Sequence, residues 1–137
     1  MSDGTLRLLG LLLTVYQPRR PTVLVVEEPE ATVHPAIAEL VMQVFLDASW
    51  RQQVILTTHS PDLLDAKELS DEQIRVVSQR LGRTVIAPLG QASRQAIRER
   101  LYTPGELLRL GELDNDAEGA LAAAAACDPF AEIPAST

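Results

Sequence analysis

The sequence predicts an α/β fold, on the basis of three observations. Two short apolar runs, 22–26 and 53–58, consist largely of β-branched residues without polar alternation, which is typical of strands buried on both faces of a parallel sheet. Between them, apolar residues recur at helical spacing, namely Ile37, Leu40, Val41, Val44 and Phe45. The order strand, helix, strand with short joints predicts a right-handed parallel crossover.

The remaining elements follow from local signals. A helix is expected over 5–16, capped by Ser2 or Asp3, and its apolar residues lie on every side, which predicts a buried helix. "SPDLLD" should open a short helix, and "QIRVVSQ" and "RTVIAPL" flank a turn and predict a hairpin. Helices are expected over 92–101 and 104–110. The whole is a mainly parallel sheet with an appended C-terminal β-hairpin and helices.

Length and charge bound the domain organisation. A chain of 137 residues with 46% apolar residues is one small globular domain. Residues 1–100 hold 11 basic and 12 acidic side chains, whereas residues 101–137 hold one basic and seven acidic ones. From residue 114 the chain is Ala-rich and acidic without periodicity. We therefore expect a domain over 1–113 and a loosely attached or disordered tail over 114–137, which could include a short helix through the alanines.

Two classes of protein are disfavoured. The single cysteine, Cys127, excludes a disulfide framework within the chain and fits a reducing cytoplasm. The most apolar stretch, "LRLLGLLLTVY", is about half the ~20 residues that a bilayer crossing needs, so no membrane span is expected.

Charged residues follow both predicted strands. Glu27 and Glu28 end the first strand, and His59 ends the second. Ligands of open α/β sheets bind beyond the carboxyl ends of the strands, and parallel strands end on one edge. Neighbouring carboxylates repel each other unless a cation lies among them. A metal ion accompanied by phosphate is therefore expected at this edge.

The motifs at these positions resemble those of a known family. "VLVVEEPE" followed by "HP", and then "ILTTHSP", look like the second half of an ABC-type ATPase nucleotide-binding domain, in the branch of the RecF-related and OLD (overcoming lysogenization defect) proteins. The opening "MSDGTLR" resembles that family's signature motif. The resemblance covers roughly residues 2–110. It implies a P-loop NTPase-like fold, with ATP and Mg²⁺ as cofactors.

The resemblance also implies residue roles. Glu27 falls at the Walker B acid that orients the Mg²⁺ shell through water, and Glu28 at the carboxylate that polarises the attacking water. His59 falls at the switch position that senses the γ-phosphate. The signature would be formed by Ser2, Gly4 and Thr5, which bind the ATP of the opposite subunit at a helix N-terminus. Residues 31–35 would be the D-loop at the seam of a dimer.

One essential part of an ATPase is missing from the sequence. It contains no G-x-x-x-x-G-K-[ST] motif, and its only lysine, Lys67, has no glycine nearby. The chain therefore resembles the C-terminal lobe alone, with the Walker A lobe missing, and either a longer protein or another chain must supply that lobe. Alone it should not hydrolyse ATP. Relatives in this family often act on DNA.

Two alternative functions remain open. The chain could be a non-catalytic interaction subunit that completes a partner's ATP site. It could also be a metal-dependent nuclease whose metal cluster is formed by Glu27, Glu28, Glu30 and His59.

Several residues also have plainer interpretations. His34 is expected to be a structural turn residue, and Glu30 an exposed residue or a support of the D-loop. "SDGT" by itself is an ordinary helix cap. The arginines of "SRQAIRER", which are Arg94, Arg98 and Arg100, could bind nucleic acid, but a solvated helix face paired with Glu99 and other acids is favoured.

Overall fold

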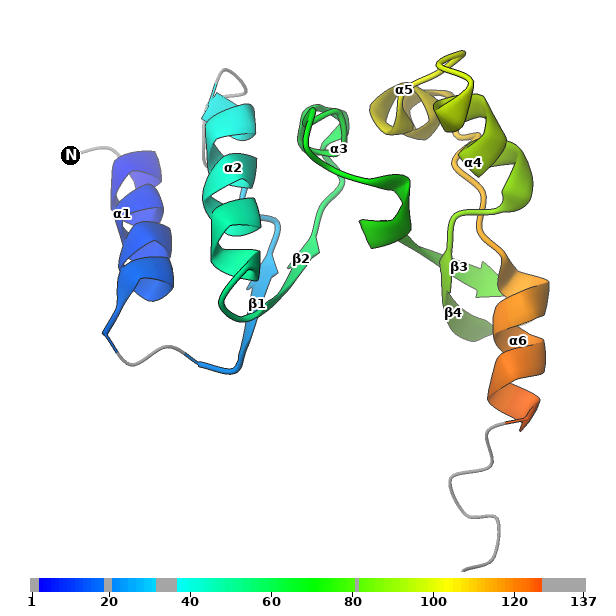
Figure 1. Cartoon of the computed structure of the whole chain (residues 1–137), viewed down its shortest axis with the longest axis horizontal. Coiled ribbons are helices and arrows are strands. Elements are labelled where there is room, and N and C mark those ends of the chain that lie inside the picture. Colours follow the sequence, from blue (N-terminus) through cyan, green and yellow to red (C-terminus); the bar gives the residue numbers. More distant parts are fainter. Residues whose placement is uncertain (1–2, 19–20, 32–36, 81, 127–137) are drawn as a thin grey trace, which may run out of the picture.

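The computed structural model describes residues 3–18, 21–31, 37–80 and 82–126. In Figure 1 the chain forms two halves that meet at α3. The first half contains α1 (Asp3–Tyr16), β1 (Val23–Glu27), α2 (Ala38–Ser49) and β2 (Gln53–Thr57). The second half follows α3 (Pro61–Leu64) and a 3₁₀ turn (Asp71–Gln73), and it contains β3 (Arg75–Arg80), β4 (Arg83–Pro88), α4 (Gln91–Arg98), α5 (Pro104–Leu110) and α6 (Ala117–Ala126).

The predicted order of strand, helix and strand is present. β1 and β2 pair in parallel, in a register that runs from Val23 opposite Gln53 to Glu27 opposite Thr57. Both strands therefore end on one edge of the sheet. β3 and β4 form the predicted antiparallel hairpin, but as a separate two-stranded sheet. Within the described residues the parallel part is thus a single pair of strands.

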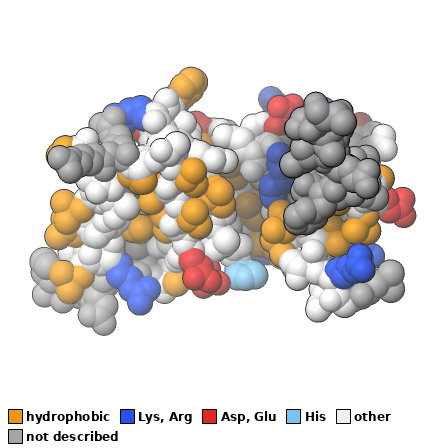
Figure 2. All heavy atoms as spheres, turned by 90° about the horizontal axis from the view of Figure 1, so that it is seen from below, with side chains coloured by type: hydrophobic (Ala, Val, Ile, Leu, Met, Phe, Trp, Pro, Cys, Tyr) orange, Lys and Arg blue, Asp and Glu red, His pale blue; other side chains and the backbone are white. Residues whose placement is uncertain are grey.

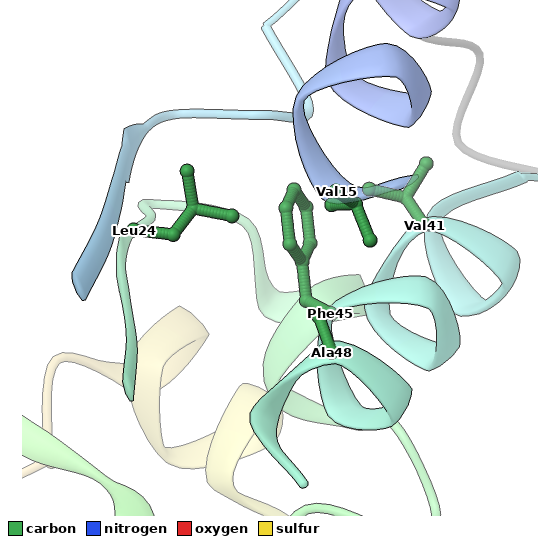
Figure 3. Packing of buried hydrophobic residues seen from close by; sticks show 5 residues of the cluster. All are labelled: Val15, Leu24, Val41, Phe45 and Ala48. Carbon is green, nitrogen blue, oxygen red and sulfur yellow. The ribbon is translucent and has the colours of Figure 1, made fainter. Parts of the chain in front are cut away.

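An apolar core joins the parallel pair to its helices (Figure 3). Val41, Phe45 and Ala48 recur on one face of α2, and each is 2% exposed. The Phe45 ring lies between Leu24 of β1 and Val15 of α1. This spacing of apolar residues is the one that predicted α2, and it places the helix on the inner face of the strands.

The expectation that these strands are buried on both faces is wrong for this chain. Leu24 is 6% exposed, whereas Val25 is 64% and Ile55 44% exposed. Successive residues of a strand point to opposite faces. The core residues of α1 and α2 pack on the face that holds Leu24, and no described element covers the other face.

The expectation that α1 is buried all round is also wrong. Val15 is 3% exposed, and Leu8 and Leu11 pack against the same core. On the other side the helix exposes Leu6, Leu9, Leu13 and Tyr16, each by about half or more. α1 has α2 on one side only, so the described part of the chain covers one stripe of it. Figure 2 shows many apolar side chains on the surface of the half that holds α1.

The short helix allowed for through the alanines is present as α6, but residues 114–126 are attached to the hairpin and do not form a loose tail. The side-chain amide of Asn115 donates to Ser78 Oγ (2.7 Å) and to the Val76 carbonyl (3.3 Å) across the hairpin. α6 then packs on β4, where Ala117 joins a cluster with Val85 and Ala87. Small alanine side chains let the helix approach the strand closely. The composition alone does not predict this packing, because it does not identify the strand that the helix contacts. Residues 127–137, including Cys127, lie outside the described residues.

Helices long and apolar enough to cross a bilayer do not occur among the described residues. α1, the longest described helix, has 14 residues, which is short of the ~20 that a span requires.

Candidate functional site

The turn after β1 is anchored to the neighbouring strand. The backbone N–H of Glu28 donates to the carbonyl of Thr57 (2.9 Å), and the N–H of Ala31 closes the turn on the carbonyl of Glu28 (3.0 Å). Glu28 has φ 40°, in the left-handed region that non-glycine residues rarely adopt. Pro29 is buried behind it. Backbone strain of this kind is concentrated at functional sites.

The segment after β2 is equally short. Ser60 caps α3, since its hydroxyl accepts a hydrogen bond from the Leu63 N–H (3.4 Å), and Pro61 occupies the first helical position. Only Thr58 and His59 separate the strand from this cap. The histidine is therefore held between two fixed elements while its side chain stays 90% exposed.

The two predicted catalytic residues lie side by side. His59 Nε2 is 3.8 Å from Glu28 Oε1, and the Glu28 side chain is 46% exposed. Their attraction requires a protonated imidazole and is screened by solvent, so it contributes little to stability. Their exposure leaves both groups accessible to a ligand. Figure 2 shows a histidine beside acidic side chains on the surface.

Sequence analysis missed the role of Glu30. Its Oε1 accepts a hydrogen bond from the Thr58 hydroxyl and another from the His59 N–H (3.2 Å). Glu30 is half-buried, not an exposed turn residue. The E-x-E spacing of Glu28 and Glu30 could have indicated this role. It places two carboxylates on the short turn after β1, beside the end of β2.

Glu27 lies beside a shallow hollow of about 250 Å³ between α1 and the end of β1. Its lining includes Arg7, Gly10 and Thr14 from α1, together with Glu28. Within the described ranges, no three His, Cys, Asp or Glu side chains are arranged to hold a metal ion. The four-residue metal cluster hypothesised for a nuclease is therefore not formed.

The predicted signature and D-loop are described only in part. Ser2 lies outside the described residues, whereas Gly4 and Thr5 are in the first turn of α1. Of the D-loop only Ala31 is described, and His34 also falls outside. α1 and α2 point the same way in Figure 1, so the amino end of α1 lies toward the end of the molecule where β1 and β2 finish.

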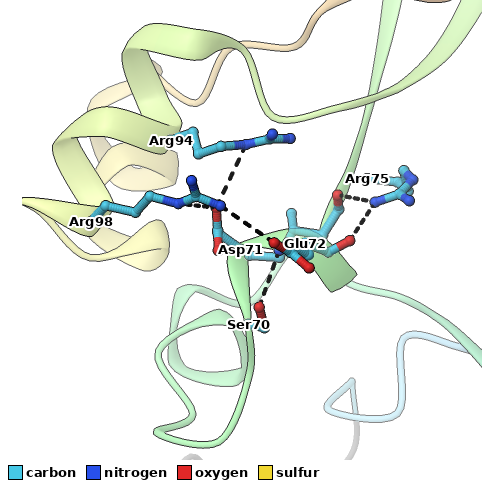
Figure 4. A network of polar contacts seen from close by, with 7 residues as sticks. Ser70, Asp71, Glu72, Arg75, Arg94 and Arg98 are labelled. Atoms are coloured by element: carbon cyan, nitrogen blue, oxygen red, sulfur yellow. Dashed lines mark hydrogen bonds and ion pairs between the residues drawn. The ribbon is translucent and has the colours of Figure 1, made fainter.

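The arginines of α4 form an ion-pair network (Figure 4). Arg98 Nε donates to Asp71 (3.0 Å) and its terminal nitrogen lies 3.4 Å from Glu72, while Arg94 Nε lies 3.5 Å from Asp71. The favoured interpretation, an ion-paired face, is confirmed for these two. The acidic partners of these arginines are Asp71 and Glu72 of the 3₁₀ turn. Glu99, the expected partner, instead accepts a hydrogen bond from Gln95.

Two comparisons with known proteins found a match. Residues 1–65 match the family model described as "AAA domain, putative AbiEii toxin, Type IV TA system". A solved structure from work on the structural biochemistry of ATP-driven dimerization and DNA-stimulated activation of SMC ATPases is similar, with a TM-score of 0.53 and 20% sequence identity. The similarity covers 74% of this chain and 62% of that chain. No curated protein matches.

The two comparisons show a similarity to a known family over residues 1–65 and a similarity of fold over 74% of the chain. Residues 1–65 are similar to an AAA domain, and the fold of the chain is similar to that of an SMC ATPase. The family match covers residues 1–65, a little under half of the chain, and Glu27, Glu28 and His59 lie within it. The chain spans 62% of the length of the solved relative.

Proposed function

We propose that this chain is the C-terminal lobe of an ABC-type ATPase and supplies signature, Walker B, D-loop and switch-histidine elements for ATP binding and hydrolysis. The observation that carries the proposal is the pair formed by Glu28 and His59, 3.8 Å apart where two parallel strands end. Phosphoryl transfer needs an oriented attacking water and compensation of the phosphate charge. Glu28 would orient the water, and the His59 imidazole N–H would donate to the phosphate.

The residues present suit Mg²⁺ and ATP in part: the acidic and imidazole groups are there, but the sequence lacks the phosphate-binding loop and its lysine. Glu27 and Glu28 are exposed carboxylates at the strand ends and His59 is an exposed N–H donor, as the magnesium-bound side of a triphosphate requires. When bound, Mg²⁺ would neutralise the charge that develops on the phosphates. Glu27 would orient its water shell, Glu28 would polarise the attacking water, and His59 would donate to the γ-phosphate.

The open face of the parallel pair supports completion by another lobe. Val25 and Ile55 are exposed on it, although the uninterrupted apolar pattern of both strands is typical of strands covered on both sides. A lobe with the phosphate-binding loop would cover this face and supply the lysine that the sequence lacks at such a loop. The isolated chain is expected to be inactive.

The active unit in this proposal is a dimer. Ser2, Gly4 and Thr5 would complete the ATP site of the opposite subunit, and ATP would drive engagement. ATP-driven dimerization and DNA-stimulated activation are described for the solved relative. DNA is accordingly the proposed effector of the complete protein, and the cytoplasm its proposed location.

The test begins with the coding sequence directly upstream, where an in-frame P-loop is expected, or else with a partner chain that contains one. In the completed protein, Glu28→Gln should retain ATP binding and lower kcat by a factor of about 10² or more, because the neutral amide cannot polarise the attacking water. Glu112→Gln, an exposed change in the other half, is the control. Hydrolysis by Glu28→Gln at the normal rate would refute the role of Glu28.

The missing lysine motif favours one second candidate, a non-catalytic subunit that completes a partner's ATP site. It predicts nucleotide-dependent assembly with that partner and turnover that Glu28→Gln leaves unchanged. Sedimentation of the mixture with and without ATP, combined with turnover by the mutant complex, distinguishes the two candidates.

A further inference from the structure

Glu30 connects the two loops of the candidate site. It lies two residues after Glu28 on the turn that follows β1, and its Oε1 accepts from both the Thr58 hydroxyl and the His59 N–H. The Thr58 hydroxyl oxygen in turn accepts from the N–H of Ser60 (2.9 Å). One carboxylate oxygen thus organises the whole segment between β2 and the cap of α3.

The turn that follows β1 contacts both the ring and the backbone of His59. Its ring contacts Glu28 (3.8 Å), while its backbone N–H contacts Glu30 (3.2 Å). The turn itself is closed by the hydrogen bond from Ala31 to Glu28. Any change that releases the backbone of His59 from Glu30 also allows the imidazole to move away from Glu28.

Glu28 and Glu30 differ in burial, and this difference indicates different roles. Glu28 and His59 are exposed and can meet a ligand, but Glu30 is half-buried. Its second oxygen, Oε2, is buried and has no hydrogen-bond partner among the described residues. Placing a carboxylate oxygen there is costly, and the two bonds to Oε1 offset that cost because bonds to an ionised acceptor are strong.

We infer that Glu30 is a positioning residue: it fixes the main chain of His59 so that the imidazole faces Glu28. Its effect on catalysis rests on the proposed function, whereas its effect on His59 does not. Glu30 Oε1 is engaged by Thr58 and His59, so in this proposal it acts through His59 and its loss should change turnover more than ATP affinity.

The structural part is tested on the 137-residue chain by NMR. Glu30→Ala should speed exchange of the His59 amide by about tenfold, the effect of losing one charge-assisted hydrogen bond. It should also abolish the NOE between the His59 ring and the Glu28 side chain. Glu30→Gln should keep most of both signals, because its amide oxygen can accept the same bonds. Amides of Val54 and Leu56 report whether β2 stays intact, and Glu112→Gln is the matched control.

An unchanged His59 amide and ring contact in Glu30→Ala would overturn the inference, and so would equal losses in the Gln and Ala variants. If Glu30→Ala does not fold, Thr58→Val removes one of the two bonds and should shift the same His59 signals. In the completed ATPase, Glu30→Ala should lower kcat by about tenfold and leave KM for ATP within about twofold. A completed protein without any ATPase activity would refute the proposed function, while the NMR result would still decide the role of Glu30.

Discussion

The backbone N–H of Gly105, in the first turn of α5, donates a 2.7 Å hydrogen bond to the carboxylate of Asp65, which ends α3. Arg109, one helical turn further on, approaches Asp65 (3.7 Å) and Asp62 (2.8 Å). These contacts join the half that bears the candidate site to the hairpin half. α3 follows His59 by two residues, so its anchorage also helps to hold the histidine in place.

Gly105→Ala should destabilise this junction. An added Cβ would overlap the Asp65 carboxylate and the Pro61 carbonyl, and we expect a loss of about 3 kcal/mol in the free energy of unfolding, as for other overpacked contacts. Urea denaturation followed by circular dichroism measures it. Gly10→Ala is the control, because its Cβ would meet nothing within 4 Å and alanine favours a helix interior by about 1 kcal/mol. Equal stability of the two variants would contradict the close approach of Gly105 to Asp65 and Pro61.

Asn115→Ala should release α6 from the hairpin. The change removes the bonds to Ser78 and Val76 and should cost about 1–2 kcal/mol, since it leaves partly buried partners unsatisfied. Hydrogen exchange of the α6 amides should accelerate, while exchange in α2 should not change. Gln79→Ala, at an exposed position of β3, serves as the control. Protection of α6 that survives Asn115→Ala would mean that the alanine contacts alone hold the helix.

Leu24→Ala and Val25→Ala should differ sharply although the residues are adjacent. Leu24 is 6% exposed in the core, and its truncation should cost about 2–4 kcal/mol. Val25 is 64% exposed on the open face, so its truncation should cost about 0.5 kcal/mol or less in the isolated chain. Thermal unfolding of both variants measures the difference. In a complete protein whose second lobe covers the open face, Val25→Ala should become costly; an effect that stays small there would argue against the proposed covering lobe.

The sequence by itself determined most of the local structure and indicated where the candidate site lies. Uninterrupted β-branched runs predicted β1 and β2, helical spacing predicted α2, and turn and cap residues predicted the hairpin, α3 and α5, because each signal comes from residues close together in the chain. Parallel pairing follows from the crossover, which is why Glu28 and His59 could be expected on one edge before any coordinates were known.

The tertiary structure alone decided which surfaces are covered and what supports the site. Apolar residues on every side of α1 and on both faces of β1 predict burial, but burial depends on which neighbours are present, and here α1 and α2 cover one side only. Asn115 and Glu30 make their contacts with residues 37 and 28 positions away in the chain. Partners that distant are selected by packing, and neither composition nor periodicity identifies them.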